Sequence, residues 1–519
     1  MLQRGDSDFA WFRERTQSLH SDCLSAYTEK MASTTSPDGL TSEPANPQDR
    51  AAHSLPPKSY AQAVNEEAAP LDQQEEQRVN GERSNGNGVA NGHKEDVDDA
   101  KVLYTEHTSQ NGQIPLTSIK PSEEYEEGLR HNAKRAPHKE VGPGVEKGMK
   151  RQDVPNAQQA PHLASGRRAG AGWETSAIRW APLNVPLQRR LQTLAVLWHT
   201  TTIPIFLSLF FLLCAIPLTW PLLIPYLLYI LLISEDSTNG TLSRRSNWLR
   251  RSKFWSAFAS YFPARLHRTV ELEPTRKFIF GYHPHGIISH GAFAAFGTEA
   301  LGFADLFPGI TNTLLTLDTN FRVPLYRDYA LAMGLASVSR ESIENLLSRG
   351  GHNGEGMGRA VTIVIGGARE SLDAKPHSLR LVLKSRKGFV KLAIRTGADL
   401  VPVLAFGENE LYEQVDSVEH PWIHNLQMVV KRGLGFTVPL FHARGIFNYD
   451  VGLLPYRRSV NVVVGRPIKV VQQGGRDGKV DESYLDEVHQ RYVDELLWLW
   501  NEYKDTFATA RKGELQIVE

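Results

Sequence analysis

The sequence has 519 residues, with 58 Lys and Arg against 58 Asp and Glu, and two cysteines, Cys23 and Cys214. Its length allows two to four domains, at about 100 to 200 residues per domain. Two cysteines exclude a disulfide-rich scaffold or a cysteine-rich zinc module, and the zero net charge gives no support to a nucleic-acid-binding protein.

Residues 1–172 are rich in Asn, Gly, Gln, Glu, Ser and Pro. Segments such as residues 82–92, ERSNGNGVANG, cannot bury enough apolar surface to offset the entropy lost on ordering. This composition predicts a disordered polar tail over residues 1–172. The first 20 residues are charged throughout and lack the apolar stretch of a secretory signal.

A long apolar segment follows the tail. Residues 191–234 contain no Asp, Glu, Lys or Arg, a composition typical of a membrane-embedded segment. As one straight helix, residues 203–233 would extend about 46 Å, well beyond a hydrocarbon core of about 30 Å. Pro217, Pro221 and Pro225 supply a place to bend, because proline interrupts the helical hydrogen bonds. The alternative is a buried helix pair of a soluble domain.

The charges around this segment favour a hairpin. Arg189 and Arg190 precede it and Arg244 and Arg245 follow it, and positive charge on both sides places both ends in the cytosol. The sequence therefore predicts a membrane-embedded hairpin over residues 191–234. Asn239-Gly240-Thr241 is a glycosylation sequon just beyond it, which we expect to stay unmodified because it faces the cytosol.

Residues 250–519 have the pattern of a mixed α/β domain. Short β-branched and aromatic runs at 277–282, 361–365, 400–406 and 460–464 end beside Gly or Pro and predict strands. Helical patterns occur at 342–347, 388–395 and 481–507. This alternation predicts a largely parallel sheet covered by helices, with functional residues in loops at the carboxyl ends of strands. Residues 421–433 fit either a membrane-surface element or an amphipathic element of the core.

The loop after the first of these strands carries three histidines, His283, His285 and His290. Their spacing, H-x-H-x4-H, allows a metal site, but no nearby Asp or Glu completes a ligand shell. A structural pair of histidines is a second reading. The third, which we favour, is a general base, because imidazole titrates near neutral pH.

A second strand ends in the turn Gly366-Gly367-Ala368, followed by Arg369 and Glu370. A carboxylate at this position could orient an imidazole, and the arginine could attract a phosphate. A solvated turn explains the same two residues equally well on spacing alone.

Six sequence blocks, taken together and in order, resemble those of the type-2 diacylglycerol acyltransferase family. The resemblance runs from about residue 186 to residue 503 and leaves out the tail. It implies a mixed sheet like that of the glycerolipid acyltransferases, whose His-x4-Asp pair this domain lacks in a suitable loop. The blocks are Tyr282-His283-Pro284-His285-Gly286, GGARESL at 366–372, RKGFVKLA at 386–393, LVP at 400–402, FGENE at 406–410 and VGRPI at 464–468.

The resemblance, together with the chemistry of these residue types, implies a role for each. His285, in preference to His283, is the expected base, and Glu370 is expected to hold its ring and offset its charge. Backbone N–H groups of the glycine turns are expected to stabilise the oxyanion. The turn residues are Gly286, Gly366 and Gly367, and the residues expected to bind the phosphates of acyl-CoA are Arg369, Arg386 and Lys387.

The implied activity is acyl transfer from acyl-CoA, as co-substrate and without a cofactor or metal, to 1,2-diacylglycerol. The implied partners are membrane lipids, with no nucleic acid, and a homo-oligomer is left open. The implied location is the endoplasmic-reticulum membrane and the lipid droplet, with the catalytic domain facing the cytosol. Two alternatives stay open: another acceptor, namely monoacylglycerol, a long-chain alcohol or a sterol, or a non-catalytic protein that anchors to lipid droplets.

Overall fold

A computed structural model describes residues 103–106, 116–119, 180–181, 185–414, 441–475 and 478–518. Most of the predicted tail and the segment 421–433 lie outside these described residues. Two short pieces of the tail are described, and both are strands: β1 (Leu103–Glu106) and β2 (Leu116–Ile119). Leu116 is fully buried, and β2 pairs with the main sheet, so these residues differ from the disordered tail predicted over residues 1–172.

The centre of the fold is a nine-stranded mixed sheet in the order β1-β2-β3-β12-β9-β4-β7-β5-β6. At its middle, β4 (Phe278–His283) lies between β7 (Arg359–Val364) and β9 (Asp399–Phe406) and runs parallel to both. All six residues of β4 are buried, which is typical of a strand covered on both faces. Since parallel strands end at one edge of a sheet, the loops after β4, β7 and β9 meet there.

The four strands expected from the sequence are therefore confirmed, and the predicted mixed α/β class is confirmed with them. The sheet is completed by β3 (Arg265–Arg268), β5 (Thr311–Thr316), β6 (Ala336–Ser337) and β12 (Asn461–Val464). Two small sheets pair β10 (Glu413–Gln414) with β11 (Phe441–His442) and β8 (Arg380–Val382) with β13 (Gln516–Val518).

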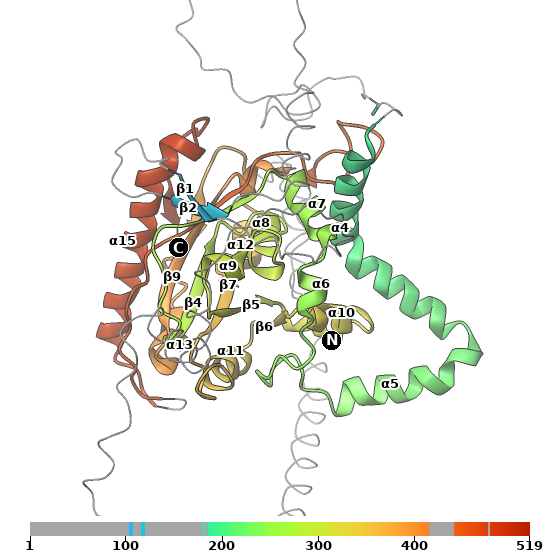
Figure 1. The fold of residues 1–519 in the computed structure, drawn as a ribbon, viewed down its shortest axis with the longest axis horizontal. Coiled ribbons are helices and arrows are strands. Elements are labelled where there is room, and N and C mark those ends of the chain that lie inside the picture. The colour runs from blue at the N-terminus through green and yellow to red at the C-terminus, as the bar shows by residue number, and fades with distance from the viewer. Residues whose placement is uncertain are drawn as a thin grey trace, which may run out of the picture. The chain divides into compact units, whose positions relative to one another are not determined.

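Helices cover both faces of the sheet (Figure 1), and a separate hydrophobic core lies between the sheet and the helices on each face. The 26-residue helix α15 (Glu482–Phe507) begins where the Asp481 side chain accepts a hydrogen bond from the Ser483 N–H. Its buried residues recur every three or four positions, so one stripe faces the sheet. The same face carries α11 (Arg340–Ser348) and α13 (Gly388–Thr396); the other carries α7 (Lys253–Tyr261), α8 (His290–Ala292), the π-helix η3 (Phe293–Gly297), α9 (Phe303–Leu306) and α10 (Tyr326–Ala332).

The apolar segment forms two helices, α4 (Leu187–Cys214) and α5 (Trp220–Leu232), joined through the 3-10 turn η2 (Pro217–Thr219). The chain bends at Pro217, as predicted. Of the described helices, α4 is the one long and apolar enough to cross a membrane, by length and composition. Its first half differs from the prediction, because Gln192, Ala195 and Val196 are buried against the domain, while Leu187, Leu191 and Leu194 on its other face are exposed.

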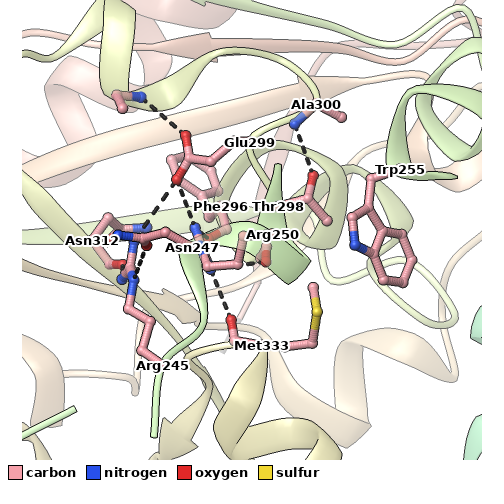
Figure 2. A network of polar contacts seen from close by, with 12 residues as sticks. Arg245, Asn247, Arg250, Trp255, Phe296, Thr298, Glu299, Ala300, Asn312 and Met333 are labelled. Atoms are coloured by element: carbon pink, nitrogen blue, oxygen red, sulfur yellow. Dashed lines mark hydrogen bonds and ion pairs between the residues drawn. The ribbon is translucent and has the colours of Figure 1, made fainter. Parts of the chain in front are cut away.

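Where the chain returns from α5, a buried ion pair fixes it to the domain (Figure 2). Arg250, at the end of α6 (Asn247–Arg250), donates to the carbonyl oxygens of Gly297 and Met333 and to Glu299, 3.1 Å away. Glu299 in turn accepts from the N–H of Ala304 at 3.2 Å. Both terminal nitrogens of Arg250 are bonded and its charge is paired with Glu299, so the pair can be buried without leaving an uncompensated charge, although Nε of Arg250 has no partner among the described residues.

Candidate active site

Three loops build the site, and they follow the three adjacent parallel strands at the centre of the sheet. The loop after β4 carries His285, the loop after β7 carries Glu370, and the loop after β9 carries Glu408. Because β7 and β9 flank β4, one carboxylate approaches the histidine loop from each side. This arrangement agrees with the expectation that functional residues lie at the carboxyl edge of the sheet.

The structure separates the roles of His283 and His285. His283 is fully buried, and its Nε2 lies 3.0 Å from the hydroxyl of Tyr492, which donates to the Gly281 carbonyl. Nε2 of His283 is therefore the donor to Tyr492. Burial lowers the pKa of His283 to about 3, and its Nδ1 is buried without a partner among the described residues. His283 thus has no accessible nitrogen that could take up a proton from a substrate.

His285 is half-buried, and its Nδ1 lies 3.1 Å from the carbonyl oxygen of Gly286. That contact assigns the proton to Nδ1 and leaves Nε2 as the acceptor. No described residue bonds Nε2, and the His285 side chain is partly exposed, whereas His283 and His290 are fully buried. Burial lowers the pKa of His285, so its ring is neutral at physiological pH. An accessible, neutral imidazole nitrogen is what a general base requires.

Glu370 reaches the loop in a way that the sequence did not predict. Its Oε1 accepts from the backbone N–H of His285 at 2.5 Å, and its Oε2 accepts from the N–H of Val382 at 2.8 Å. The carboxylate therefore holds the backbone at His285, in place of the expected contact with the ring. Burial raises the pKa of Glu370 to about 7.

Glu408 is the residue that sequence reasoning missed. It is buried, and it accepts from the N–H groups of His290 and Gly291, both at 2.8 Å, and from the Tyr282 hydroxyl at 2.9 Å. Burial raises its pKa to about 7. The sequence does indicate Glu408 as a candidate site residue, because it follows a predicted strand at a turn, as Glu370 does.

His290, the third histidine of the loop, is a structural residue in this arrangement. It is buried, its Nε2 lies 2.8 Å from the Tyr412 hydroxyl, and its ring stacks on Phe262. No cluster of three or more His, Cys, Asp or Glu that could hold a metal occurs in the described residues. The three histidines therefore do not converge on one point as metal ligands do.

The glycines of the two turns leave room for the carboxylates. A Cβ added at Gly286, where φ is +59°, would lie 2.7 Å from Cγ of Glu408, and a Cβ at Gly366 would overlap the carboxylate of Glu370. Gly367 has open space around it, although its φ of +64° favours glycine. Gly286 and Gly366 are thus needed for close approach, beside any role of their N–H groups.

The three basic residues expected at the site lie near its rim. Arg369 is exposed on the short helix α12 (Gly367–Ser371). Arg386 is exposed, and its guanidinium lies 3.5 Å from the Gly366 carbonyl oxygen. Lys387 forms a surface ion pair with Asp486 at 2.6 Å. Arg369 and Arg386 therefore lie close to Glu370, while Lys387 already has an anionic partner.

The sheet and its three loops define an α/β enzyme with a partly exposed imidazole on a loop whose backbone is held by two buried carboxylates. The family model for diacylglycerol acyltransferase matches residues 210–518, a range that includes every residue of this site. The chain therefore belongs to the diacylglycerol acyltransferase family, and it is an acyltransferase.

Individual relatives agree with the family assignment. The chain is 50% identical over 342 residues to diacylglycerol O-acyltransferase 2A of Umbelopsis ramanniana, covering 66% of this chain and 94% of the relative. It is 46% identical to diacylglycerol O-acyltransferase 1 of Schizosaccharomyces pombe, covering 63% and 91%. It is 43% identical to bovine 2-acylglycerol O-acyltransferase 1, covering 64% and 96%. No solved structure matches the chain.

Proposed function

We propose that the protein transfers a fatty acyl group from acyl-CoA to the free hydroxyl of 1,2-diacylglycerol and so forms triacylglycerol, with His285 as the general base. The observation that carries this proposal is the accessible Nε2 of His285, in a loop fixed by Glu370 and Glu408. The relative at 50% identity is a diacylglycerol O-acyltransferase, which favours diacylglycerol as acceptor.

In this mechanism Nε2 of His285 takes the proton from the acceptor hydroxyl as its oxygen attacks the thioester carbonyl carbon. A tetrahedral oxyanion forms and collapses, the carbon–sulfur bond breaks, and the CoA thiolate takes the proton back from His285. The N–H groups of His285, His290 and Gly291 are already bonded to carboxylates. The oxyanion is therefore assigned to the remaining turn donors, the N–H groups of Gly286, Gly366 and Gly367.

Glu370 contributes by positioning the base. Its bond to the His285 N–H fixes the backbone from which the ring projects, and holding reacting groups in line lowers the barrier without direct contact. Arg369 and Arg386 supply positive charge at the rim for the CoA phosphates. Lys387 joins them when it exchanges Asp486 for phosphate.

The second candidate acceptor is monoacylglycerol. The specific observation is that the bovine relative, a 2-acylglycerol O-acyltransferase, is 43% identical to the chain, the same value as diacylglycerol O-acyltransferase 2B of Umbelopsis ramanniana. Both acceptors present a primary or secondary hydroxyl on a glycerol backbone, so the base needs no change between them.

The exposed hairpin supports a location in the endoplasmic-reticulum membrane, with access to lipid droplets and with the domain in the cytosol. Residues 203–233 carry most of the exposed large apolar side chains of the described chain. The diacylglycerol acceptor reaches the site from the same membrane. Unmodified Asn239 is the expected sign of cytosolic orientation; a mass shift removed by glycosidase and by Asn239→Gln would place this segment in the lumen.

The activity is tested with microsomes that express the full chain, labelled acyl-CoA, and diacylglycerol or monoacylglycerol as acceptor. We expect labelled triacylglycerol from diacylglycerol, and its loss in His285→Ala. Transfer to monoacylglycerol alone would show that monoacylglycerol and not diacylglycerol is the acceptor, and would leave the proposed acyl-transfer mechanism unchanged. No transfer to either lipid, a long-chain alcohol or a sterol would overturn the enzyme assignment and favour an anchoring protein.

A further inference from the structure

Large apolar side chains are exposed at a second place, away from the hairpin. They come from residue 180, from the start of α4 and from the loop 446–453. The exposed fractions are 70% for Trp180, 72% for Leu187, 67% for Phe447 and 69% for Leu453. We call this surface the α4 patch; its other members are Leu191, Leu194, Ile446 and Val451.

The three segments of the α4 patch are bonded to one another. The N–H of Ala181 donates to the Phe447 carbonyl at 2.7 Å, which ties residue 180 to the loop. Arg457, just after the loop, donates to the side chain of Gln192 at 2.5 Å and so holds the loop against α4. These specific contacts place residue 180, the loop and the start of α4 beside one another.

Charge is kept out of the surface of the loop in the α4 patch. Between residues 446 and 454 the only Asp, Glu, Lys or Arg is Asp450, and its side chain is buried. The exposed positions of this loop are apolar: Ile446, Phe447, Val451 and Leu453. A protein surface in water has little reason to expose apolar side chains while burying its one carboxylate, whereas a lipid surface favours that arrangement.

The patch and the hairpin share one face of α4. Leu187, Leu191 and Leu194 lie on one stripe, because their spacing of four and three residues matches the helical repeat. The same spacing, continued along the helix, reaches three exposed residues of the hairpin, Ile205, Leu209 and Leu212. Trp198, between the two groups, packs against the domain core, so one helix presents two exposed apolar groups on the same face.

The length of the hairpin decides where the membrane surface lies. Residues 203–214 of α4 extend about 18 Å and the 13 residues of α5 about 20 Å, both short of a hydrocarbon core of about 30 Å. A hairpin with such arms enters and leaves the same leaflet. The headgroup layer then passes next to the domain, on the side where Figure 1 shows α4, and opposite to α15.

We propose that the α4 patch is a second lipid-contacting surface, which inserts Phe447, Leu453 and Trp180 into the headgroup layer of the membrane that holds the hairpin. Its ligand is the interfacial region of a phospholipid bilayer. The inference rests on the membrane anchoring of the hairpin and goes beyond the proposed reaction. Attachment through both the hairpin and the α4 patch fixes the tilt of the domain relative to the membrane. Attachment through the hairpin alone would leave this tilt free.

The test uses the full chain with Cys23→Ser and Cys214→Ser, reconstituted into phosphatidylcholine vesicles. Single cysteines replace Phe447 or Leu453 and carry a nitrobenzoxadiazole fluorophore, and quenching by phosphatidylcholine with brominated acyl chains is measured. Leu222→Cys, in the hairpin, is the positive control, and Gln490→Cys, exposed on α15, is the negative control. We expect quenching at 447 and 453 as at 222, and none at 490.

The outcomes separate the inference from its premises. Quenching at 222 without quenching at 447 and 453 overturns the second contact and keeps the hairpin in the membrane. No quenching at 222 overturns the membrane anchoring, and the α4 patch proposal with it. A label at 447 that is shielded from aqueous iodide, insensitive to bromolipid and dependent on protein concentration assigns the patch to a second copy of the chain, which also overturns the proposal. Acyl transfer is measured separately and does not enter these readouts.

Discussion

Oε1 of Glu370 lies 2.5 Å from the backbone nitrogen of His285. Both hydrogen bonds that the Glu370 carboxylate accepts come from backbone N–H groups. Glu370, which the sequence predicted as the partner of the His285 ring, thus binds the His285 backbone. The ring nitrogen Nδ1 instead meets the Gly286 carbonyl, 3.1 Å away. The base is held by the shape of its loop, and the loop is held from two sides by carboxylates.

Substitution at the two histidines is expected to separate chemistry from stability. His285→Ala should lower kcat by about 10²- to 10⁴-fold, the usual contribution of a general base, with little change in Tm. His283→Gln should lower stability by about 1 to 3 kcal/mol, because the buried hydroxyl of Tyr492 loses the hydrogen bond that it accepts from His283 and keeps only its bond to Gly281, while most of kcat remains. Acyl transfer and thermal unfolding of the same preparations check both. Equal loss of kcat in the two variants would contradict the assignment of the base.

Removal of Glu408 is expected to displace the histidine loop. Glu408→Ala takes the acceptor from His290, Gly291 and Tyr282, and a displacement of the loop by about 1 Å costs on the order of 10²-fold in kcat. The KM for acyl-CoA should stay within about twofold, because its phosphates bind elsewhere. Hydrogen exchange should increase in residues 283–292.

The matched control for Glu408 is Glu299, another buried carboxylate with backbone and side-chain partners, shown in Figure 2. Glu299→Gln should lower Tm and leave kcat nearly unchanged below the unfolding transition. If both variants lose kcat and Tm in the same proportion, Glu408 acts only on stability.

The pH dependence of the reaction should follow the carboxylates. Burial lowers the pKa of His285, so the base stays neutral below its ordinary value of 6.5, whereas Glu370 and Glu408 have pKa values of about 7. Each carboxylate accepts N–H bonds best when ionised, so kcat/KM should rise as the pH increases through about 7. Profiles of the wild type and of Glu370→Gln should differ in this acid limb. An identical limb in Glu370→Gln and Glu408→Gln would assign it to another group.

The turn glycines offer a test of close packing. Gly366→Ala places a methyl group into the carboxylate of Glu370, so the carboxylate must move away from the His285 N–H, with a loss of kcat of about tenfold or more. Gly388→Ala is the control, because a Cβ there meets nothing within 4 Å and Gly388 begins the helix α13. Gly388→Ala should keep kcat and raise Tm slightly. Full activity of Gly366→Ala would show that the carboxylate is not needed in its present position.

The positions of the secondary-structure elements, and the residue types in the loops that follow them, can be derived from the sequence. The runs at 277–282 and 400–406 fix strands through β-branched and aromatic side chains, and the stripe Leu485, Val488 and Tyr492 fixes one face of a helix. These are local properties of side-chain shape and periodicity, so they can be read along the chain. The same holds for the apolar hairpin and for the histidines beside glycine and proline.

Tertiary structure alone decided which residues meet. That Glu370 and Glu408 bond to one loop follows from the order β9-β4-β7, which pairs strands more than 70 residues apart in sequence. Burial of His283 against Tyr492 and accessibility of His285 depend on α15, a helix more than 190 residues away. Long-range packing also decides the surroundings of the start of α4. From the sequence its apolar residues look lipid-facing, but in the structure packing against α7 buries half of them. Hydrophobicity is a local property, but the neighbour that covers an apolar residue, or pairs a polar one, is set by long-range packing.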